Sequence, residues 1–256
     1  MNKALPNSVT DRIKALCLCI VFLCTLPVVA EEKPARHLFI LSGQSNMTGN
    51  LVKGFTATVE EAYGKENVTI AMSMKSGRGL RYWCSDYRYS DDHQPSDQEK
   101  TDNGSLYQAL IDAVKTAAGD KSFDTVTFIW MQGESDAGKS RADVYAENFL
   151  KLLNRLKTDL KRERMPFVIG RISDHDMKNE KFPDWTKMRE VQVKLAESQS
   201  DGAWINTDDL NDIAQAKPGA DTLHYGKEES VTLGERFAAK AIEMINTSHQ
   251  SNQPPQ

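Results

Sequence analysis

The chain has 256 residues and a formal net charge of −4, with 36 acidic and 32 basic residues. No basic run interleaves with aromatic residues, so the composition argues against a nucleic acid partner. The length suffices for one domain with a sizeable hydrophobic core.

The first 30 residues have the pattern of a secretory signal peptide. Lys3, Arg12 and Lys14 form a basic leader, an apolar run from Ala15 to Val29 follows, and Ala30 is the small residue that signal peptidase requires. We expect cleavage after Ala30 and a secreted or periplasmic protein without stable membrane association. A retained N-terminal anchor is the alternative, although this apolar run is short for a membrane span.

The expected mature chain consists of one domain and a short tail. The domain covers residues 31–247, and the polar tail, residues 248–256, contains two prolines and is predicted to be disordered. Cys84 is the only cysteine outside the signal segment, so neither an intrachain disulfide nor a cysteine-based zinc site is possible.

Strand-like and helix-like segments alternate along the domain. The predicted strands are apolar or β-branched runs at 38–41, 67–72, 125–131, 166–172 and 203–206. The predicted helices carry apolar residues at helical spacing and lie at 105–118, 144–161, 185–195 and 231–245. This alternation favours parallel strand pairing with helices on both faces. We therefore predict an α/β fold, a three-layer α/β/α sandwich with a five-stranded parallel sheet.

Small and polar residues follow the first predicted strand. Ser42 and Gly43 end the apolar run, and Ser45 comes at the carboxyl end of the strand, where open α/β sheets place their ligands. This place suits a nucleophilic serine, but a serine that only caps a helix would give the same pattern. The motif is not the Gly-x-Ser-x-Gly elbow, because Met47 occupies the place of the second glycine.

Asp221 and His224 precede the last predicted helix, at the same edge of the sheet. Three residues apart in a turn, the carboxylate can accept the proton on Nδ1 and leave Nε2 as a base, which is the arrangement of a Ser-His-Asp triad. A capping aspartate beside a surface histidine is the alternative.

Two further stretches fall at this edge. In the motif 130–136, Gln132 could donate an amide hydrogen to an oxyanion, whereas Glu134 and Asp136 could form a carboxylate pair. Two acids without a neighbouring histidine indicate a metal only weakly, so we predict no metal. The glycines of the stretch 76–83 could present a further N–H to the oxyanion, or simply form a turn.

Together these motifs resemble the blocks of the SGNH (GDSL-like) hydrolases. The resemblance rests on Gly43–Met47, Gln132–Asp136 and Asp221–His224. Within the superfamily, these motifs most resemble the branch that contains sialate O-acetylesterases and the acetyl xylan esterases of carbohydrate esterase family six. Shorter stretches at 104–107, 166–170 and 207–210 are also similar to that branch. The resemblance implies the flavodoxin-like SGNH hydrolase fold.

The resemblance also implies roles for single residues. Ser45 would be the nucleophile, His224 the general base and then acid, and Asp221 the residue that orients the histidine. The oxyanion hole would comprise the Ser45 N–H, a glycine N–H and the Gln132 side chain.

The glycine-containing block is where the chain departs from many relatives, which have Gly-Gly-Thr there. Here the sequence is Ser-Gly-Arg-Gly at 76–79. Spacing back from Trp83 favours Gly77 as the donor, and Gly79 is the alternative. Arg78 and Arg81 hint at an acidic or uronic acid-bearing substrate, with solvated loop cations as the other interpretation.

Four residues are candidates for substrate binding. Gln44 and Asn46 flank Ser45, Arg78 lies in the glycine-containing block, and His175 follows the fourth predicted strand. The polar stretch 90–103 is interpreted as a surface insertion that could shape the cleft.

The sequence thus predicts a secreted serine esterase that removes O-acetyl groups from carbohydrates through an acetyl-enzyme. The substrate would be acetylated xylan, sialic acid or a related glycan, and no cofactor is expected. One alternative is an SGNH esterase acting on other small acyl esters, and another is a non-catalytic carbohydrate-binding protein. A binding protein would not require all three of Ser45, Asp221 and His224. We make no prediction of the oligomeric state.

Overall fold

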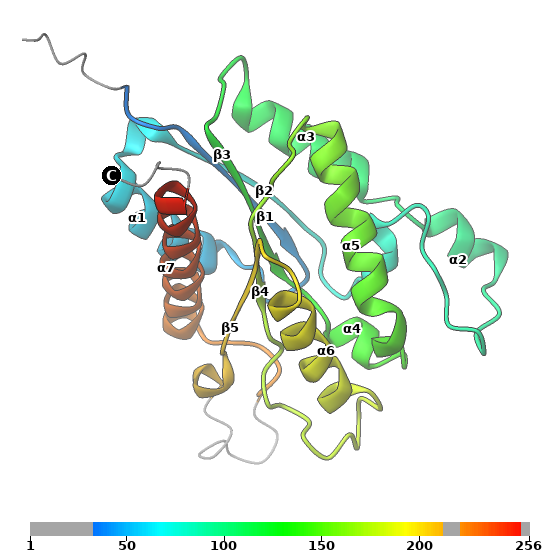
Figure 1. The fold of residues 1–256 in the computed structure, drawn as a ribbon. Coiled ribbons are helices and arrows are strands. Elements are labelled where there is room, and N and C mark those ends of the chain that lie inside the picture. The colour runs from blue at the N-terminus through cyan, green and yellow to red at the C-terminus, as the bar shows by residue number, and fades with distance from the viewer. Residues whose placement is uncertain (1–32, 212–220, 252–256) are drawn as a thin grey trace, which may run out of the picture. The chain divides into compact units, whose positions relative to one another are not determined.

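The computed structural model describes residues 33–211 and 221–251. The chain divides into two units, Met1–Lys33 and Pro34–Gln256, and the second unit holds every helix and strand described (Figure 1). The predicted signal peptide, residues 1–30, lies outside the described residues.

Five parallel strands form the sheet, in the order β2-β1-β3-β4-β5. The strands are β1 (His37–Gly43), β2 (Val68–Met74), β3 (Thr125–Met131), β4 (Phe167–Gly170) and β5 (Gly202–Ile205). Strand β1, which lies between β2 and β3, is buried over its whole length, and this burial explains its apolar sequence. The predicted five-stranded parallel sheet is confirmed.

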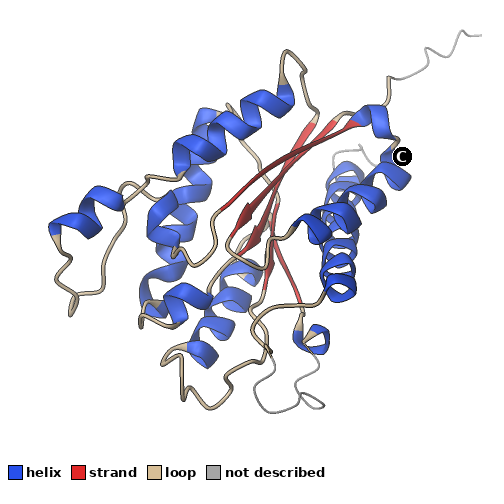
Figure 2. Ribbon diagram, turned by 180° about the vertical axis from the view of Figure 1, so that it is seen from behind, coloured by secondary structure: helices blue, strands red, loops and turns tan. Residues whose placement is uncertain are grey.

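Helices cover both faces of the sheet. One face carries α1 (Gly49–Tyr63) and α7 (Lys227–Ser251), and the other carries α3 (Tyr107–Ala118), α5 (Ala142–Asp159) and α6 (Trp185–Glu197) (Figures 1 and 2). Successive residues of β1 divide between the two cores, because side chains of a strand alternate between its faces. Leu38 and Ile40 join the core under α3 and α5, whereas Phe39 and Leu41 join the core under α1 and α7. The three-layer sandwich is thereby confirmed.

Short helical segments complete the secondary structure. They are η1 (Lys65–Asn67), η2 (Leu80–Trp83), α2 (Asp97–Asp102), α4 (Glu134–Ala137) and η3 (Asp208–Leu210). None of the helices within the described ranges is apolar over a length sufficient to cross a bilayer.

The helix pair α1 and α7 packs with its backbones in close approach. A Cβ atom on Gly54 of α1 would lie 2.2 Å from the carbonyl oxygen of Val231, and one on Gly234 of α7 would lie 2.1 Å from that of Leu51. Only glycine permits this distance. Since α1 follows Ser45 and α7 follows His224, their tight packing fixes the two candidate catalytic segments relative to each other.

The sequence predicted neither α1 nor the full length of α7. Two glycines and several β-branched residues give α1 a low intrinsic helix propensity, so burial of Leu51, Phe55 and Val59 against the core decides its conformation. The tail expected to be disordered from residue 248 begins as helix, because α7 continues to Ser251. Each residue added to an established helix gains a backbone hydrogen bond at little cost. Residues 252–256 lie outside the described residues.

The polar insertion at 90–103 is ordered around α2. Ser96 and Glu99 form a capping box at the start of this helix. Arg81, only 4% exposed, donates to the Glu99 carbonyl oxygen at 2.7 Å, and Arg141 pairs with the Glu99 carboxylate at 2.7 Å. Buried arginines therefore anchor the insertion to the domain.

Candidate active site

The loop that carries Ser45 is fixed to the end of β3. Gly43 has φ 143°, and a Cβ atom there would lie 2.0 Å from the Met131 carbonyl oxygen. The N–H of Gln44 donates to that same oxygen at 2.9 Å. Any residue but glycine would force β1 and β3 apart, so this glycine determines where the chain leaves the sheet.

Thr48, and not Ser45, caps the helix that follows. The Thr48 hydroxyl accepts a hydrogen bond from the N–H of Leu51 at 3.2 Å, which is the N-cap contact of α1. The interpretation of Ser45 as a mere capping residue is therefore wrong. Half-buried Ser45 keeps its hydroxyl for another partner.

That partner is His224. Its Nε2 lies 3.0 Å from the Ser45 Oγ, and its Nδ1 lies 2.8 Å from the Asp221 Oδ2. The other Asp221 oxygen accepts the backbone N–H groups of Leu223 and His224 at 3.0 and 3.1 Å. The structure thus brings together all three residues predicted to act as the triad.

Asp221 is held in its ionised form. Desolvation would raise its pKa, but hydrogen bonds from the His224 ring and from the backbone N–H groups outweigh that effect and lower the pKa. An ionised Asp221 accepts the proton on His224 Nδ1, so Nε2 is left to accept the Ser45 proton.

Asn46 connects the serine loop to two other segments. Its amide nitrogen donates to the Glu134 Oε1 at 2.8 Å and to the Leu223 carbonyl oxygen at 3.1 Å. Both Asn46 and Glu134 are buried, and desolvation raises the pKa of Glu134. Asn46, which we predicted to bind substrate, is thus committed to holding the serine and histidine loops together.

The Gln132 side chain lies in the interior of the protein. This side chain is 0% exposed, and its Nε2 donates to the Asp136 Oδ2 at 2.6 Å, with Gln44 Oε1 at 3.3 Å. The Gln132 amide is therefore hydrogen-bonded within the protein, and its contact with an oxyanion stays a prediction. The Gln132 amide donates to the buried Asp136 carboxylate, because a carboxylate is a stronger hydrogen-bond acceptor than water.

The two glycines of the glycine-containing loop lie in different surroundings. Gly77 stands in an exposed turn at φ 65°, where a Cβ atom would have no neighbour within 4 Å, whereas Gly79 is buried. A Cβ atom on Gly79 would lie 3.0 Å from the Asp136 Oδ1, and the neighbouring Arg78 carbonyl oxygen lies 3.4 Å from the Gln132 Nε2. Gly79 therefore lies beside the residues under the serine loop.

The remaining candidates separate into structural and accessible residues. Buried Arg81 anchors the insertion, while exposed Arg78 lies 4.9 Å over the ring of Tyr82 and has no carboxylate partner among the described residues. The His175 Nδ1 is 2.8 Å from the Thr222 hydroxyl, so this histidine supports the loop between Asp221 and His224. Desolvation lowers the pKa of His175.

Residues 53–243 match the family model described as carbohydrate esterase, sialic acid-specific acetylesterase. The chain belongs to this family. The predicted resemblance to the SGNH carbohydrate esterases is confirmed, and the protein is an esterase of the carbohydrate acetylesterase type. No curated protein sequence matches the chain.

Solved structures support the fold of this acetylesterase family member. A protein from Arabidopsis thaliana has a TM-score of 0.59 and 17% identity, covering 82% of this chain and 99% of that one. A carbohydrate acetylesterase from Xanthomonas citri gives 0.58 and 17%, covering 81% and 56%. NanS gives 0.52 and 16%, covering 76% and 70%. At these identities the likeness is one of fold.

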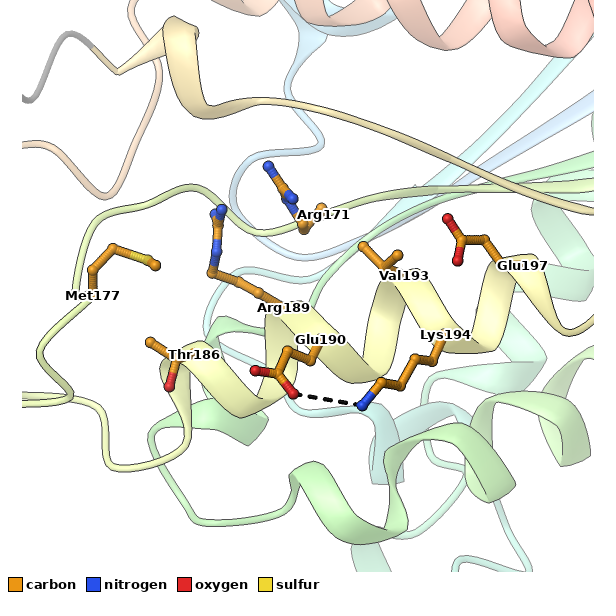
Figure 3. Close-up of a pocket in the computed structure, with 8 residues that line it drawn as sticks. All are labelled: Arg171, Met177, Thr186, Arg189, Glu190, Val193, Lys194 and Glu197. Carbon is orange, nitrogen blue, oxygen red and sulfur yellow. Dashed lines mark ion pairs between the residues drawn. The ribbon is translucent and has the colours of Figure 1, made fainter.

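A hollow of ≈ 390 Å³ on the esterase lies apart from the triad. It runs along α6, and Figure 3 shows the side chains that line it: Arg171, Met177, Thr186, Arg189, Glu190, Val193, Lys194 and Glu197. Its two arginines share the carboxylate of Asp208, at 2.7 and 2.8 Å. No cluster suited to a metal occurs among residues 33–211 and 221–251, and the absence of a cofactor stays a prediction.

Proposed function

We propose that this member of the acetylesterase family removes O-acetyl groups from carbohydrates with Ser45 as the nucleophile. The observation that carries the proposal is the pair of contacts from His224, 3.0 Å to Ser45 and 2.8 Å to Asp221. These are the distances at which a base can accept the hydroxyl proton and a carboxylate can orient that base.

Acylation begins when the Ser45 Oγ bonds to the acetyl carbonyl carbon. The hydroxyl proton moves to His224 Nε2, and the carbonyl oxygen becomes an oxyanion. When the tetrahedral intermediate collapses, the carbon–oxygen bond to the sugar breaks. His224 then gives its proton to the departing sugar oxygen, which leaves an acetyl group on Ser45.

Deacylation repeats these steps with water. His224 takes a proton from the attacking water, whose oxygen bonds to the acetyl carbon. Collapse of the second intermediate breaks the bond to Ser45, which regains its proton from His224, and acetate leaves. Asp221 stabilises the imidazolium form of His224 in both halves of the reaction.

Backbone N–H groups would stabilise the oxyanion. Among the residues that the structure describes, neither the Ser45 N–H nor the Gly79 N–H has a hydrogen-bond acceptor, so neither donor is committed to another protein group. Of the two glycines that the sequence left open, we propose Gly79 as the donor, because it packs against the buried Asp136 carboxylate. Preorganised donors of this kind supply a large share of the rate enhancement in acyl transfer.

The family description and the surface around the site support an acetylated sialic acid or a related acidic glycan as the substrate. Arg78 is exposed, belongs to the loop beside Gln132, and has no carboxylate partner among the described residues. A sugar carboxylate would provide one. Export of the protein belongs to the same proposal and is supported by the basic and apolar pattern of residues 1–30.

Acetate release from acetylated sialic acid, acetylated xylan and acetylated pectin tests the proposal. We expect release from at least one of these substrates and its loss in Ser45→Ala. Ser105→Ala, a substitution at an exposed serine outside the site, is the matched control and should keep wild-type rates. Binding of the glycans without acetate release would indicate a carbohydrate-binding protein, and release from simple acyl esters alone would indicate a general esterase.

A further inference from the structure

Asp136 has a fully buried carboxylate that accepts two hydrogen bonds through one oxygen. The Oδ2 atom lies 2.7 Å from the backbone nitrogen of Leu80 and 2.6 Å from the Gln132 Nε2, and the residue is 0% exposed. Burial of a carboxylate carries a large desolvation penalty, which only good hydrogen bonds can offset. A neutral side chain could join the two loops without that penalty.

The first hydrogen bond fixes the glycine-containing loop. Leu80 follows Gly79, and Gly79 itself packs on the same carboxylate, where a Cβ atom would lie 3.0 Å from the Oδ1. The position of the Gly79 N–H therefore depends on Asp136 both through the adjacent peptide and through direct packing.

The second hydrogen bond continues to the residue before the nucleophile. Gln132 Nε2 lies 3.3 Å from the Gln44 Oε1, which also accepts the N–H of Ser135 at 3.2 Å. Gln44 is 4% exposed and directly precedes Ser45. A continuous buried chain thus runs from Asp136 through Gln132 to the peptide that carries the Ser45 N–H.

We infer that Asp136 is the positioning residue of the oxyanion hole, because it sets the Gly79 N–H and the Ser45 N–H relative to each other. The inference rests on the proposed function, since it assigns a task within that same site. Asp136 touches neither the substrate nor the triad. It acts through its hydrogen bonds to Leu80 and Gln132 and through its packing against Gly79.

Glu134, the other acid of the motif, has a different task. It accepts from Asn46, which also holds the Leu223 carbonyl oxygen, and so it supports the triad side of the site. The two acids of one motif thus support different parts of the site.

Oxyanion donors need distances of about 2.7–3.1 Å to the developing charge, so a small displacement of either loop lowers the rate of the chemical step.

The test compares Asp136→Ala with Asp136→Asn on a small acetyl ester. Alanine removes the acceptor, and we expect kcat to fall by roughly 10²–10³ with KM changed little. Asparagine keeps one oxygen that can accept both N–H groups, so it should stay within about tenfold of the wild type, which is rescue by the conservative variant. Ser45→Ala reports independently on the proposed function, because a fully active Ser45→Ala would contradict that function whatever Asp136 does.

Asp184→Ala is the matched control for stability. The Asp184 carboxylate also accepts a backbone N–H from another segment, that of Ala142 at 3.1 Å, but touches neither Gln132 nor the glycine-containing loop. We expect it to lower the melting temperature without lowering kcat. If Asp136→Ala does not fold, Gln132→Met, which breaks the chain while sparing the Leu80 contact, should lower kcat at least about tenfold at unchanged KM. A folded variant of Asp136→Ala or Gln132→Met with wild-type kcat, or equal losses in Asp136→Asn and Asp136→Ala, would overturn the inference.

Discussion

The triad and the hydrogen-bond chain beneath it are built in opposite ways. The side chains of His224 and Asp221 are 43% and 62% exposed, and the Asp–His contact spans only three residues of one turn. Gln132 and Asp136 are 0% exposed and join three separate segments. Local geometry thus suffices for the acid–base pair, whereas the donors for the oxyanion need tertiary structure to hold them. Five predictions, taken from the largest expected effect to the smallest, test the triad and the structure that surrounds it.

The exposed part of the site should fail completely when either reacting group is removed. Ser45→Ala and His224→Ala should each lower kcat by roughly 10⁴–10⁶, and the double variant should be little worse, since the two residues act as one unit. Turnover of a small acetyl ester measures this. Additive losses in the double variant would mean that the 3.0 Å contact between them is not a working proton-transfer pair.

Asp221→Asn tests how much an exposed carboxylate contributes. The amide can present an N–H to the Nδ1 of His224 and favour the wrong tautomer, so we expect kcat to fall by about 10²–10⁴. The backbone contacts of Leu223 and His224 to the other oxygen can persist in this variant. An unchanged kcat with unchanged folding would show that the His224 orientation is fixed by its backbone alone.

Asn46→Ala should affect stability as well as activity. It leaves the buried Glu134 carboxylate without its side-chain donor and the Leu223 carbonyl oxygen without a partner, which should cost about 1–3 kcal/mol of unfolding free energy. Chemical denaturation measures the loss. Asn50→Ala, at a half-buried neighbouring asparagine in α1, is the control and should change stability much less.

The anchored insertion should respond to acid. Desolvation would raise the pKa of Glu99, but the Ser96 N–H, His93 and Arg141 outweigh it and lower the pKa to about 2, from an ordinary value of 4.5. Because the folded-state pKa is the lower one, Glu99 contributes stability above about pH 4.5, and that contribution is lost as the pH falls toward 2. The melting temperature of the wild type should therefore fall more between pH 5 and pH 3 than that of Glu99→Gln. Equal falls would contradict the assignment.

Thiol modification should have the smallest effect. Cys84 is 1% exposed, and burial together with its contact to Asp86 raises the pKa of the thiol to about 12. At neutral pH the thiol is neutral and shielded, so iodoacetamide treatment should leave esterase activity intact. Near-total inactivation of folded protein by the reagent would instead implicate a cysteine mechanism and contradict the role of Ser45.

Most of the sheet could be predicted because its interior strands β1, β3 and β4 are buried on both faces. A continuous apolar run such as 125–131 is typical of a strand that is covered on both faces of a sheet. Strand β3 has those same bounds. Helix α1 could not be predicted in the same way. Its sequence favours a helix only weakly, and the close backbone contact of Gly54 with α7 is a tertiary interaction that no local pattern contains.

The sequence by itself determined the fold class and the membership of the acetylesterase family, and it placed Ser45, Asp221 and His224 at one edge of the sheet. These predictions were possible because the motifs are short stretches of sequence and the strands show a periodic pattern. The carboxyl ends of parallel strands then bring the motifs to one edge of the sheet. Only the tertiary structure decided that Gln132 is buried, that Gly79 packs against Asp136 whereas Gly77 stands in an exposed turn, and that Asn46 and Arg81 have structural contacts. The direction of a polar side chain depends on which acceptors distant segments bring near it, and spacing along the chain carries no information about those segments.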